Sequence, residues 1–544
     1  MFTESVTSTA RPFVIRDPVH GYLVVAAHER IVVDDPVTQR LRRITQTGLA
    51  EYVFPEARTS RFIHSLGAMH LASRFVLAAL ENAEEEVAKR FFDDIETRVP
   101  KYSGVGDSIA DLLQQNGTLS ALATVRCSFR HKSLMTSRIR ELMAVVEASV
   151  RLAALFHDLG HLPFSHDVEY ALKDYAALQE SKKRKLSDPF LAIAGAEAPH
   201  EEIGHRLAEL VFQSLADEIS PAVRASFEIA TAILNTKIPK YDLQKRPHAT
   251  TMQWLHSLVD GEIDADRADY LLRDGRALGL DFAHYDVDRL VSNLVLIYDP
   301  NLGFVTAVNE TGLAALESFC LSRSRSNQVF VRHHKVAQAS VALRHASVKA
   351  FDDPATRQLV SVIEELGASS LAGRRDLLGK LAVFDDAWWI QVLRQIQQHE
   401  SDNLTRACLN LTLDRTRTLR SVWKRKGELT EKQFRAINAK VEELIAPESG
   451  RIDLANKRRE LLNDGILIMP YKFKPYARRE PDKKSVMMIK TKDRTEPAST
   501  VSPLINRLQD AWDEDLHLYA FVRSDSGLTL EKVIEAVLAE TSGD

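Results

Sequence analysis

The stretch LFHDLGHLPFSHD, residues 155–167, brings His157, Asp158, His161 and His166 within ten residues. The residues just before it, MAVVEASVRLAALF (143–156), are apolar over several turns, and this pattern predicts a buried helix that ends by Gly160. Ionisable groups on a buried helix are costly unless they are paired or bound to a metal. Imidazole and carboxylate are good ligands for divalent transition metals. We therefore expect a metal site at the end of this helix, completed by ligands from other helices.

Two other segments offer such ligands. In TSRFIHSLGAMH (59–70), His64 begins a helical pattern and Arg61 precedes it by three residues. In DADRADYLLRDG (264–275), Asp266, Tyr270 and Asp274 follow one another at intervals of four residues. This spacing places them within an arc of about 80° on one helix face. Two acids and a tyrosine beside apolar residues predict a polar site lined by that face.

Each of these residues alone has a simpler interpretation. A single histidine in such a place is more often a hydrogen-bonded structural side chain. Asp264, Asp266 and Asp269 alone are compatible with a solvated helix start, which the helix dipole favours. The recurrence of His or Asp beside apolar helix in several separate segments favours one shared metal site.

The overall composition narrows the class of protein. The chain has 544 residues, and its net charge of −4 creates no global field that would attract nucleic acid or an anionic membrane. The absence of a stripe of alternating basic and aromatic residues also disfavours a nucleic-acid substrate. The three cysteines, Cys127, Cys320 and Cys408, lie far apart and suit a reducing compartment. Residues 1–10 lack the apolar core of a signal peptide, and no apolar run approaches the roughly 20 residues of a membrane span. We expect a cytoplasmic protein without membrane contact.

The chain is predicted to be mainly α-helical. Asp35-Pro36 predicts a helix start, and Gly48 predicts its end. At the C-terminus, SVMMIKT (485–491) and LHLYAFV (516–522) read as short strands on either side of the helix SPLINRLQDAW (502–512). We predict an HD-domain-like helical core at 1–345 with a polar insertion at about 81–140, a helical extension at 346–462, and a small α/β lobe at 463–544.

Six segments together resemble the HD superfamily of metal-dependent phosphohydrolases, which is named for its His-Asp doublet. They are DPVHGYL from Asp17, DDPVTQRLRRITQTG from Asp34, TSRFIHSLG from Thr59, HDLGHLPFSH from His157, HEEIG from His200 and DADRADYLLRD from Asp264. Their order is that of the deoxynucleoside triphosphate triphosphohydrolase branch, which includes the sterile-alpha-motif-and-HD-domain enzyme and its bacterial relatives. The matches run from about residue 13 to 290, with a weaker one at VRHHK (331–335), and the layout looks like the bacterial type.

The resemblance implies a role for each matching residue. One divalent metal (Mn, Fe, Ni, Co or Zn, with Mg as a possible second ion) would be held at the α-phosphate by His64, His157, Asp158 and Asp266. His200 would protonate the leaving 5′-oxygen and would be oriented by Glu169, while His161 and His166 would contact the α-phosphate or a second metal. The substrate would be bound by Gln46, Arg61, Arg267, Tyr270, Asp274, Arg332 and Lys335. These residue types suit the chemistry, because cations offset phosphate charge and histidine titrates near neutral pH.

The resemblance also implies regulation and assembly. Relatives suggest a dimer or tetramer, and the family's activated members bind a nucleotide between subunits. The matching positions here are Asp34, Gln39, Arg42, Asp286 and Arg289. Two positions depart from the family pattern near the sugar and base: Thr47 stands where the vertebrate relative has leucine, and Arg332 where it has tyrosine. The identity of the nucleotide is therefore open.

Three hypotheses about function follow. The first is a metal-dependent dNTP triphosphohydrolase that releases a deoxynucleoside and inorganic triphosphate. The second keeps the metal but makes the protein a phosphodiesterase or nuclease for another nucleotide or a single strand. The third is a nucleotide-sensing, non-enzymatic scaffold that keeps the site as a binding pocket.

Overall fold

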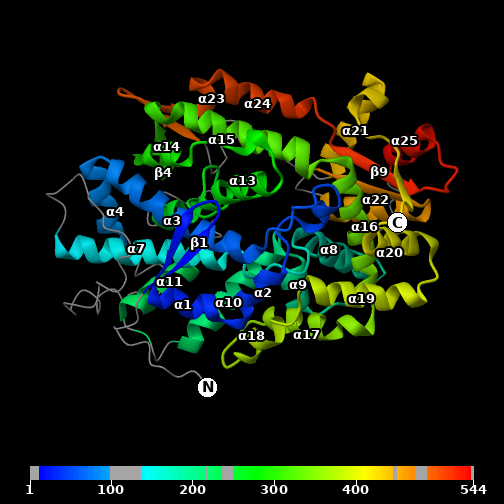
Figure 1. Cartoon of the computed structure of the whole chain (residues 1–544), viewed down its shortest axis with the longest axis horizontal. Coiled ribbons are helices and arrows are strands. Elements are labelled where there is room, and N and C mark those ends of the chain that lie inside the picture. Colours follow the sequence, from blue (N-terminus) through cyan, green and yellow to red (C-terminus); the bar gives the residue numbers. More distant parts are fainter. Residues whose placement is uncertain are drawn as a thin grey trace.

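The fold is mainly α-helical, as the sequence predicts (Figure 1). It is seen in a computed structural model, which describes residues 12–97, 136–182, 184–215, 219, 221–235, 249–444, 450–471 and 487–540. Most of the predicted insertion at 81–140, including Cys127, lies outside the described residues. Its first part is helical, because α4 spans Glu85–Thr97.

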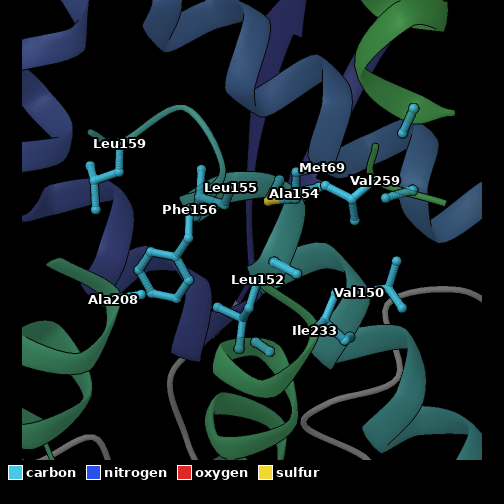
Figure 2. Close-up of a cluster of buried hydrophobic side chains, with 14 of the residues drawn as sticks. Met69, Val150, Leu152, Ala154, Leu155, Phe156, Leu159, Ala208, Ile233 and Val259 are labelled. Carbon is cyan, nitrogen blue, oxygen red and sulfur yellow. The ribbon is translucent and has the colours of Figure 1, made fainter. Parts of the chain in front are cut away.

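The core is a group of helices around α7 (Ser137–Phe156), the apolar helix that the sequence predicts. It packs against α3 (Arg61–Asn82) and α11 (Pro221–Leu234), and α3 also packs against α13 (Ala265–Ala277). Figure 2 shows side chains of this core, in which Leu152 and Phe156 of α7 lie among Met69, Ala208 and Ile233 from three other helices. Burying a leucine or phenylalanine side chain stabilises the fold by about 1.5–3 kcal/mol. The core therefore holds rigidly the helix ends that carry the chemically interesting residues.

The helix after Asp35 is shorter than the sequence predicts. The carboxylate of Asp35 accepts from the backbone N–H of Val37 and caps α2 (Pro36–Arg40), as expected, and a short turn η1 (Leu41–Arg43) follows. The chain then becomes extended and forms a bridge between Thr45 and Ser60 instead of continuing to Gly48. The cause is distant in sequence, because both the N–H and the hydroxyl of Thr45 donate to the carboxylate of Asp386.

Three small sheets accompany the helices. An antiparallel hairpin joins β1 (Phe13–Asp17) and β2 (Gly21–Val25). A second sheet has the order β3-β4-β7-β8, and a third has the order β5-β9-β6. Their strands are β3 (Leu294–Asp299), β4 (Gly303–Asn309), β7 (Met488–Lys490), β8 (Thr495–Pro497), β5 (Leu419–Ser421), β9 (Leu518–Arg523) and β6 (Ile466–Pro470).

Both predicted C-terminal strands exist, but they belong to different sheets. β7 pairs in parallel with β4 of the core, whereas β9 lies between β5 and β6. The helix between them, α24 (Pro503–Asp513), packs against α15 (Leu313–Ser326), as the upper part of Figure 1 shows. The C-terminal segment thus contributes to two layers, and the three-unit division of the chain stays a prediction.

The remaining elements are mostly helices that cover this core. On the N-terminal side they are α1 (Ala27–Asp34), η2 (Gly48–Tyr52), α8 (His166–Ser181), α9 (Asp188–Ala194), α10 (Pro199–Leu215), α12 (Ala249–Ser257), η4 (Asp281–Ala283), α14 (Val287–Ser292) and η5 (Glu310–Gly312). Beyond residue 326 they are the π-helical turn η6 (Asn327–Val331), α16 (His334–Ala350), η7 (Pro354–Thr356), α17 (Arg357–Leu366), α18 (Asp376–Leu381), α19 (Asp386–His399), α20 (Asn403–Asp414), η8 (Lys426–Glu428), α21 (Glu431–Leu444), α22 (Gly450–Asn463), α23 (Ala498–Val501) and α25 (Leu530–Leu538).

Within the described residues, α3 is the one helix long and apolar enough to cross a membrane by length and composition. Its most apolar window is 78% buried inside the protein. It also carries His64, which is fully buried against acidic side chains. We therefore interpret α3 as a core helix, and a cytoplasmic location stays a prediction.

Candidate metal and phosphate site

Four residues predicted to bind a metal meet where three core helices come together. His64 comes from α3, His157 and Asp158 from the end of α7, and Asp266 from the first turn of α13. The Nε2 atom of His64 lies 2.8 Å from Asp266 Oδ1 and 3.4 Å from Asp158 Oδ2. The Nε2 atom of His157 lies 3.3 Å from Asp266 Oδ1 and 3.4 Å from Asp158 Oδ1. Ligand bonds of about 2.1 Å in a tetrahedral site put donor atoms roughly 3–3.5 Å apart. His64, His157 and Asp158 have donor atoms that all lie within 4.8 Å of one another and could hold a divalent ion, with Asp266 beside both histidines.

A second layer of side chains orients these ligands. The Nδ1–H of His64 donates to Asp269 at 2.8 Å, and the Nδ1–H of His157 donates to the carbonyl of Ala154 at 2.7 Å. Asp269 is itself held by Arg273 and His20. Fixing Nδ1 in this way directs Nε2 toward the shared centre, the arrangement typical of metal-binding histidines.

Our sequence reasoning missed this role for Asp269, which it treated as part of a possible solvated helix start. The structure buries Asp269 completely. Its spacing of three residues from Asp266, on the same helix turn, is the sequence signal that could have found it.

The pKa of each ionisable group at the site depends on its charged neighbours. Burial alone would lower the pKa of His64, but hydrogen bonds to Asp266 and Asp269 outweigh burial and raise that pKa to about 10. Burial also opposes the charge of His157, yet Asp158 and Asp266 raise its pKa to about 9. The same contacts hold the pKa of Asp266 below its ordinary value, against the effect of burial. A cation in this position would replace these protons, because a histidine ligand must be neutral.

A second cluster lies beside the first and is centred on Glu169 of α8. Its carboxylate accepts from Nδ1 of His161 and, at 2.7 Å, from Nδ1 of His200. The Nδ1 atom of His166 lies 3.5 Å from the same carboxylate. Burial would raise the pKa of Glu169, but the imidazoles of His200 and His161 hold it well below its usual value. His161 also connects the clusters, because its Nε2 lies 3.1 Å from Asp158.

The turn between α7 and α8 shows local strain. Phe164 and Ser165 have positive φ angles of 55° and 57°, which are rare for residues other than glycine. The hydroxyl of Ser165 accepts from Nε of Arg61 at 3.0 Å and donates to the carbonyl of Thr45 at 2.7 Å. Strained residues of this kind concentrate at functional sites.

Gly160 lets α10 approach this turn. A Cβ atom at Gly160 would lie 2.1 Å from the carbonyl oxygen of His200 and 2.4 Å from the backbone nitrogen of Gly204. A side chain there would push α10 away, and His200 with it. Glycine at this position therefore sets the distance between His200 and the end of α7.

Both clusters open into a cavity of about 1410 Å³. Gln46 and Asp274 line it, as does Asn327, which our sequence reasoning did not include. Each of these three has a buried side-chain oxygen that finds no hydrogen-bond partner among the described residues. Such an atom costs about 1–3 kcal/mol, so a polar ligand in the cavity would satisfy it. Burial also raises the pKa of Asp274 to about 7.

The remaining residues predicted to bind substrate fall into two groups. Arg61, Arg267 and Tyr270 line the cavity. Arg61 Nη1 donates to Asp158 at 2.8 Å, while Arg267 is paired with Asp264. The structure does not bring Arg332 or Lys335 to the cavity wall.

Other contacts of the chain hold those two side chains. Arg332 Nη1 donates to Asp515 Oδ2 at 2.9 Å, and Lys335 Nζ donates to Gln338 at 2.8 Å. A role for Arg332 and Lys335 in substrate binding stays a prediction. A cation that sequence reasoning missed, Arg323 of α15, does line the cavity and pairs with Glu262.

The five residues proposed for regulation lie in two separate places. Near the N-terminus, Asp34 pairs with Arg30, while Arg42 donates to Gln39 at 2.7 Å. Farther along the chain, Asp286 caps α14 and Arg289 donates to the carbonyl of Thr311. Binding of an activating nucleotide at these positions stays a prediction.

Comparison with protein families and with curated proteins finds similarity to HD-domain proteins. The sequence model of the HD domain family matches residues 131–274, which contain most of both clusters. Uncharacterized protein MJ1154 of Methanocaldococcus jannaschii is 25% identical over 337 residues, which cover 62% of this chain and 49% of that protein. Deoxynucleoside triphosphate triphosphohydrolase SAMHD1 of Bos taurus is 44% identical over 154 residues, which cover 28% of this chain and 17% of the relative. The chain thus spans about half, or less, of the length of these relatives.

Among solved structures, a phosphohydrolase (BT4208) from Bacteroides thetaiotaomicron VPI-5482 is similar along most of the chain. The TM-score is 0.55 at 18% identity, with 94% of this chain and 100% of the other covered. At this identity the likeness concerns the fold alone.

Proposed function

We propose that the chain, whose residues 131–274 match the HD domain family model, is a metal-dependent phosphohydrolase that cleaves a deoxynucleoside triphosphate into a deoxynucleoside and inorganic triphosphate. The observation that carries this proposal is the joining of two clusters at one cavity. One offers ligands for a divalent ion, and the other offers a histidine with a raised pKa beside it. A divalent ion held by His64, His157, Asp158 and Asp266 would polarise the α-phosphate and make water a better nucleophile near neutral pH.

In this proposal His200 supplies the proton to the leaving 5′-oxygen. Burial works against a charged imidazole, but Glu169 outweighs it and raises the pKa of His200 above the ordinary 6.5. The acid form therefore persists to higher pH than that of an ordinary histidine. Glu169 holds Nδ1, which leaves Nε2 as the atom that would face the substrate.

Other residues would bind and orient the nucleotide. Arg61 lies against Asp158 and would offset phosphate charge beside the ion. Asp274 and Gln46, with their buried oxygens, would accept hydrogen bonds from the sugar hydroxyl and neighbouring donors. Thr47 also lines the cavity, and its hydroxyl donates to the carbonyl of Ala57 at 3.1 Å. The hydroxyl oxygen could still accept from a ribose 2′-hydroxyl, so both sugar types must be tested.

The test is hydrolysis by the purified protein with each dNTP and NTP in turn, loaded with Mn²⁺, Fe²⁺, Co²⁺, Ni²⁺, Zn²⁺ or Mg²⁺. We expect inorganic triphosphate and nucleoside in equal amounts. Single-stranded oligonucleotides and cyclic dinucleotides are assayed alongside. Cleavage of those alone would replace the proposal with a phosphodiesterase or nuclease.

A double variant separates an enzyme from a scaffold. His157→Ala with Asp158→Ala removes two metal ligands and should abolish both hydrolysis and bound metal, measured by elemental analysis. His399→Ala changes an exposed histidine at the end of α19 and serves as the matched control. Absence of triphosphate release by the parent protein with every metal and nucleotide, with and without candidate activators, would leave the scaffold hypothesis.

A further inference from the structure

The cavity continues along α8, away from the metal-type residues. His166, Tyr170, Asp174 and Ala177 all line it, and they recur about once per turn on one face of α8. The eight residue steps from His166 to Asp174 correspond to about 12 Å along the helix axis. The volume of about 1410 Å³ also exceeds the ~300–1,000 Å³ of common ligand pockets. The cavity therefore has a second end, at Asp174.

Two arginines from distant parts of the chain meet at Asp174. Arg344 of α16 donates to both carboxylate oxygens, and Arg458 of α22 donates to Oδ1 at 2.9 Å. The side chains of Arg344 and Arg458 are only 11% and 13% exposed, and both line the cavity. No other carboxylate among the described residues pairs with either guanidinium.

Two guanidiniums share the single carboxylate of Asp174 at this end of the cavity, so Asp174 alone does not balance their charge. Burial and the charge of Arg344 lower the pKa of Arg458 to about 10. The nearby Asp167 adds negative charge at neutral pH, since burial raises its pKa only to about 6, and its carboxylate accepts a hydrogen bond from Ser340. Buried guanidiniums are stabilised by directly bonded anions, and an anion in the cavity would give Arg344 and Arg458 a second such partner.

The N–H donors of the two guanidiniums also favour a bound anion. Each guanidinium has five N–H donors, whereas Asp174 accepts two hydrogen bonds from Arg344 and one from Arg458. Planar guanidinium groups match the oxygens of a phosphate especially well. Tyr170 borders this end and is 42% exposed, with the Arg344 guanidinium 5.0 Å from its ring centre.

We propose that Arg344 and Arg458 form a second phosphate-binding subsite at the Asp174 end of the cavity. The phosphate would be either a free anion or the far end of a ligand whose other phosphates lie at the metal-type residues. This subsite is independent of the hydrolytic activity proposed above, because it needs neither the metal nor turnover.

The test is isothermal titration of the chelator-treated full chain with inorganic phosphate and, separately, with tripolyphosphate, at low salt and pH 7.5. Arg458→Gln should weaken binding at least about tenfold, because it removes charged hydrogen bonds. Asp174→Asn should strengthen binding several-fold, because it removes the competing negative charge. Arg206→Gln is the matched control, since Arg206 pairs with Glu202 on α10 outside the cavity wall.

Opposite changes in anion affinity for Arg458→Gln and Asp174→Asn would separate a binding role from a structural one. Unchanged affinity for both phosphate and tripolyphosphate in Arg458→Gln, or equal weakening in Asp174→Asn, would overturn the proposal. If Arg458→Gln does not fold, as judged by thermal unfolding, Asp174→Asn and Arg458→Lys still decide. Arg458→Lys keeps the positive charge but not the planar guanidinium group, and it should weaken binding only partly. Similar losses for phosphate and tripolyphosphate indicate a free anion, whereas a loss limited to tripolyphosphate indicates the far end of a phosphate chain.

Discussion

The imidazole rings of His161 and His200 lie almost parallel, 10° apart with centroids 4.0 Å from each other, and both are hydrogen-bonded through Nδ1 to Glu169. One carboxylate thus orients two histidines that come from the α7–α8 turn and from α10. His161 reaches on to Asp158, one of the predicted metal ligands, at 3.1 Å. Glu169 therefore links the two clusters of the site, and several testable consequences depend on it and its neighbours.

Removing the charge of Glu169 should shift the pH dependence of hydrolysis. In the parent, Glu169 raises the pKa of His200, so the acid form is lost only as pH rises above the ordinary 6.5. In Glu169→Gln burial dominates, and the alkaline fall of kcat/KM should move to lower pH. A kcat/KM profile between pH 5.5 and 9.5 measures the shift. An alkaline limb at the same pH in both proteins would show that His200 is not the acid.

Metal binding should release protons. The pKa values of about 10 for His64 and about 9 for His157 mean that both are protonated at pH 7.5 in the metal-free protein. Both must lose a proton to act as ligands, so affinity should increase as pH rises toward those values. Calorimetric titration with Mn²⁺ in buffers of different ionisation enthalpy should show release of one to two protons. Equal heats in all buffers would contradict this prediction.

Asp269→Asn should weaken metal binding without removing a ligand. Asp269 fixes Nδ1 of His64, and loss of such an orienting partner typically costs 10–100-fold in metal affinity. Competition with a chromogenic chelator measures the change. Asp288→Asn, which alters an exposed partner of Arg74, is the control and should leave affinity unchanged. A purely structural role for Asp269 would lower the unfolding temperature but leave the affinity of the folded protein intact.

Two glycine substitutions should change the stability of the fold in opposite directions. Gly160→Ala places a Cβ against the backbone of α10, and overpacking of this kind costs about 1–3 kcal/mol of unfolding free energy. It should also reduce kcat, because His200 moves with α10. Gly379→Ala in α18 meets open space and should stabilise the fold by up to about 1 kcal/mol. Thermal unfolding checks both, and a Gly160→Ala protein as stable and active as the parent would contradict the tight packing.

Local patterns in the sequence were sufficient to predict the main elements. The mainly helical fold, the buried helix before His157, and the α13 face with Asp266, Tyr270 and Asp274 are all present. The order of motifs also led to the four metal-type residues, which the structure brings to one point. Local patterns succeed here because helix periodicity and the cost of burying charge act within a few turns of chain.

Other features depend on contacts between residues far apart in sequence. Asp386 ends the helix at Arg43 by accepting from Thr45, and Asp515 holds Arg332, which does not reach the cavity wall. The first predicted C-terminal strand pairs with β4 of the core, which the α/β-lobe interpretation did not foresee. Asp174, Arg344 and Arg458 meet although 284 residues separate the first from the last.

The sequence by itself therefore determined the mainly helical character, the helix before His157, the helix that carries Asp266, and the residue types that they bring to the site. Only the tertiary structure decided which partner each charged side chain takes. The reason is physical: a helix depends on neighbours within a few residues, whereas a buried charge is stabilised by whichever opposite charge the packed core brings to it.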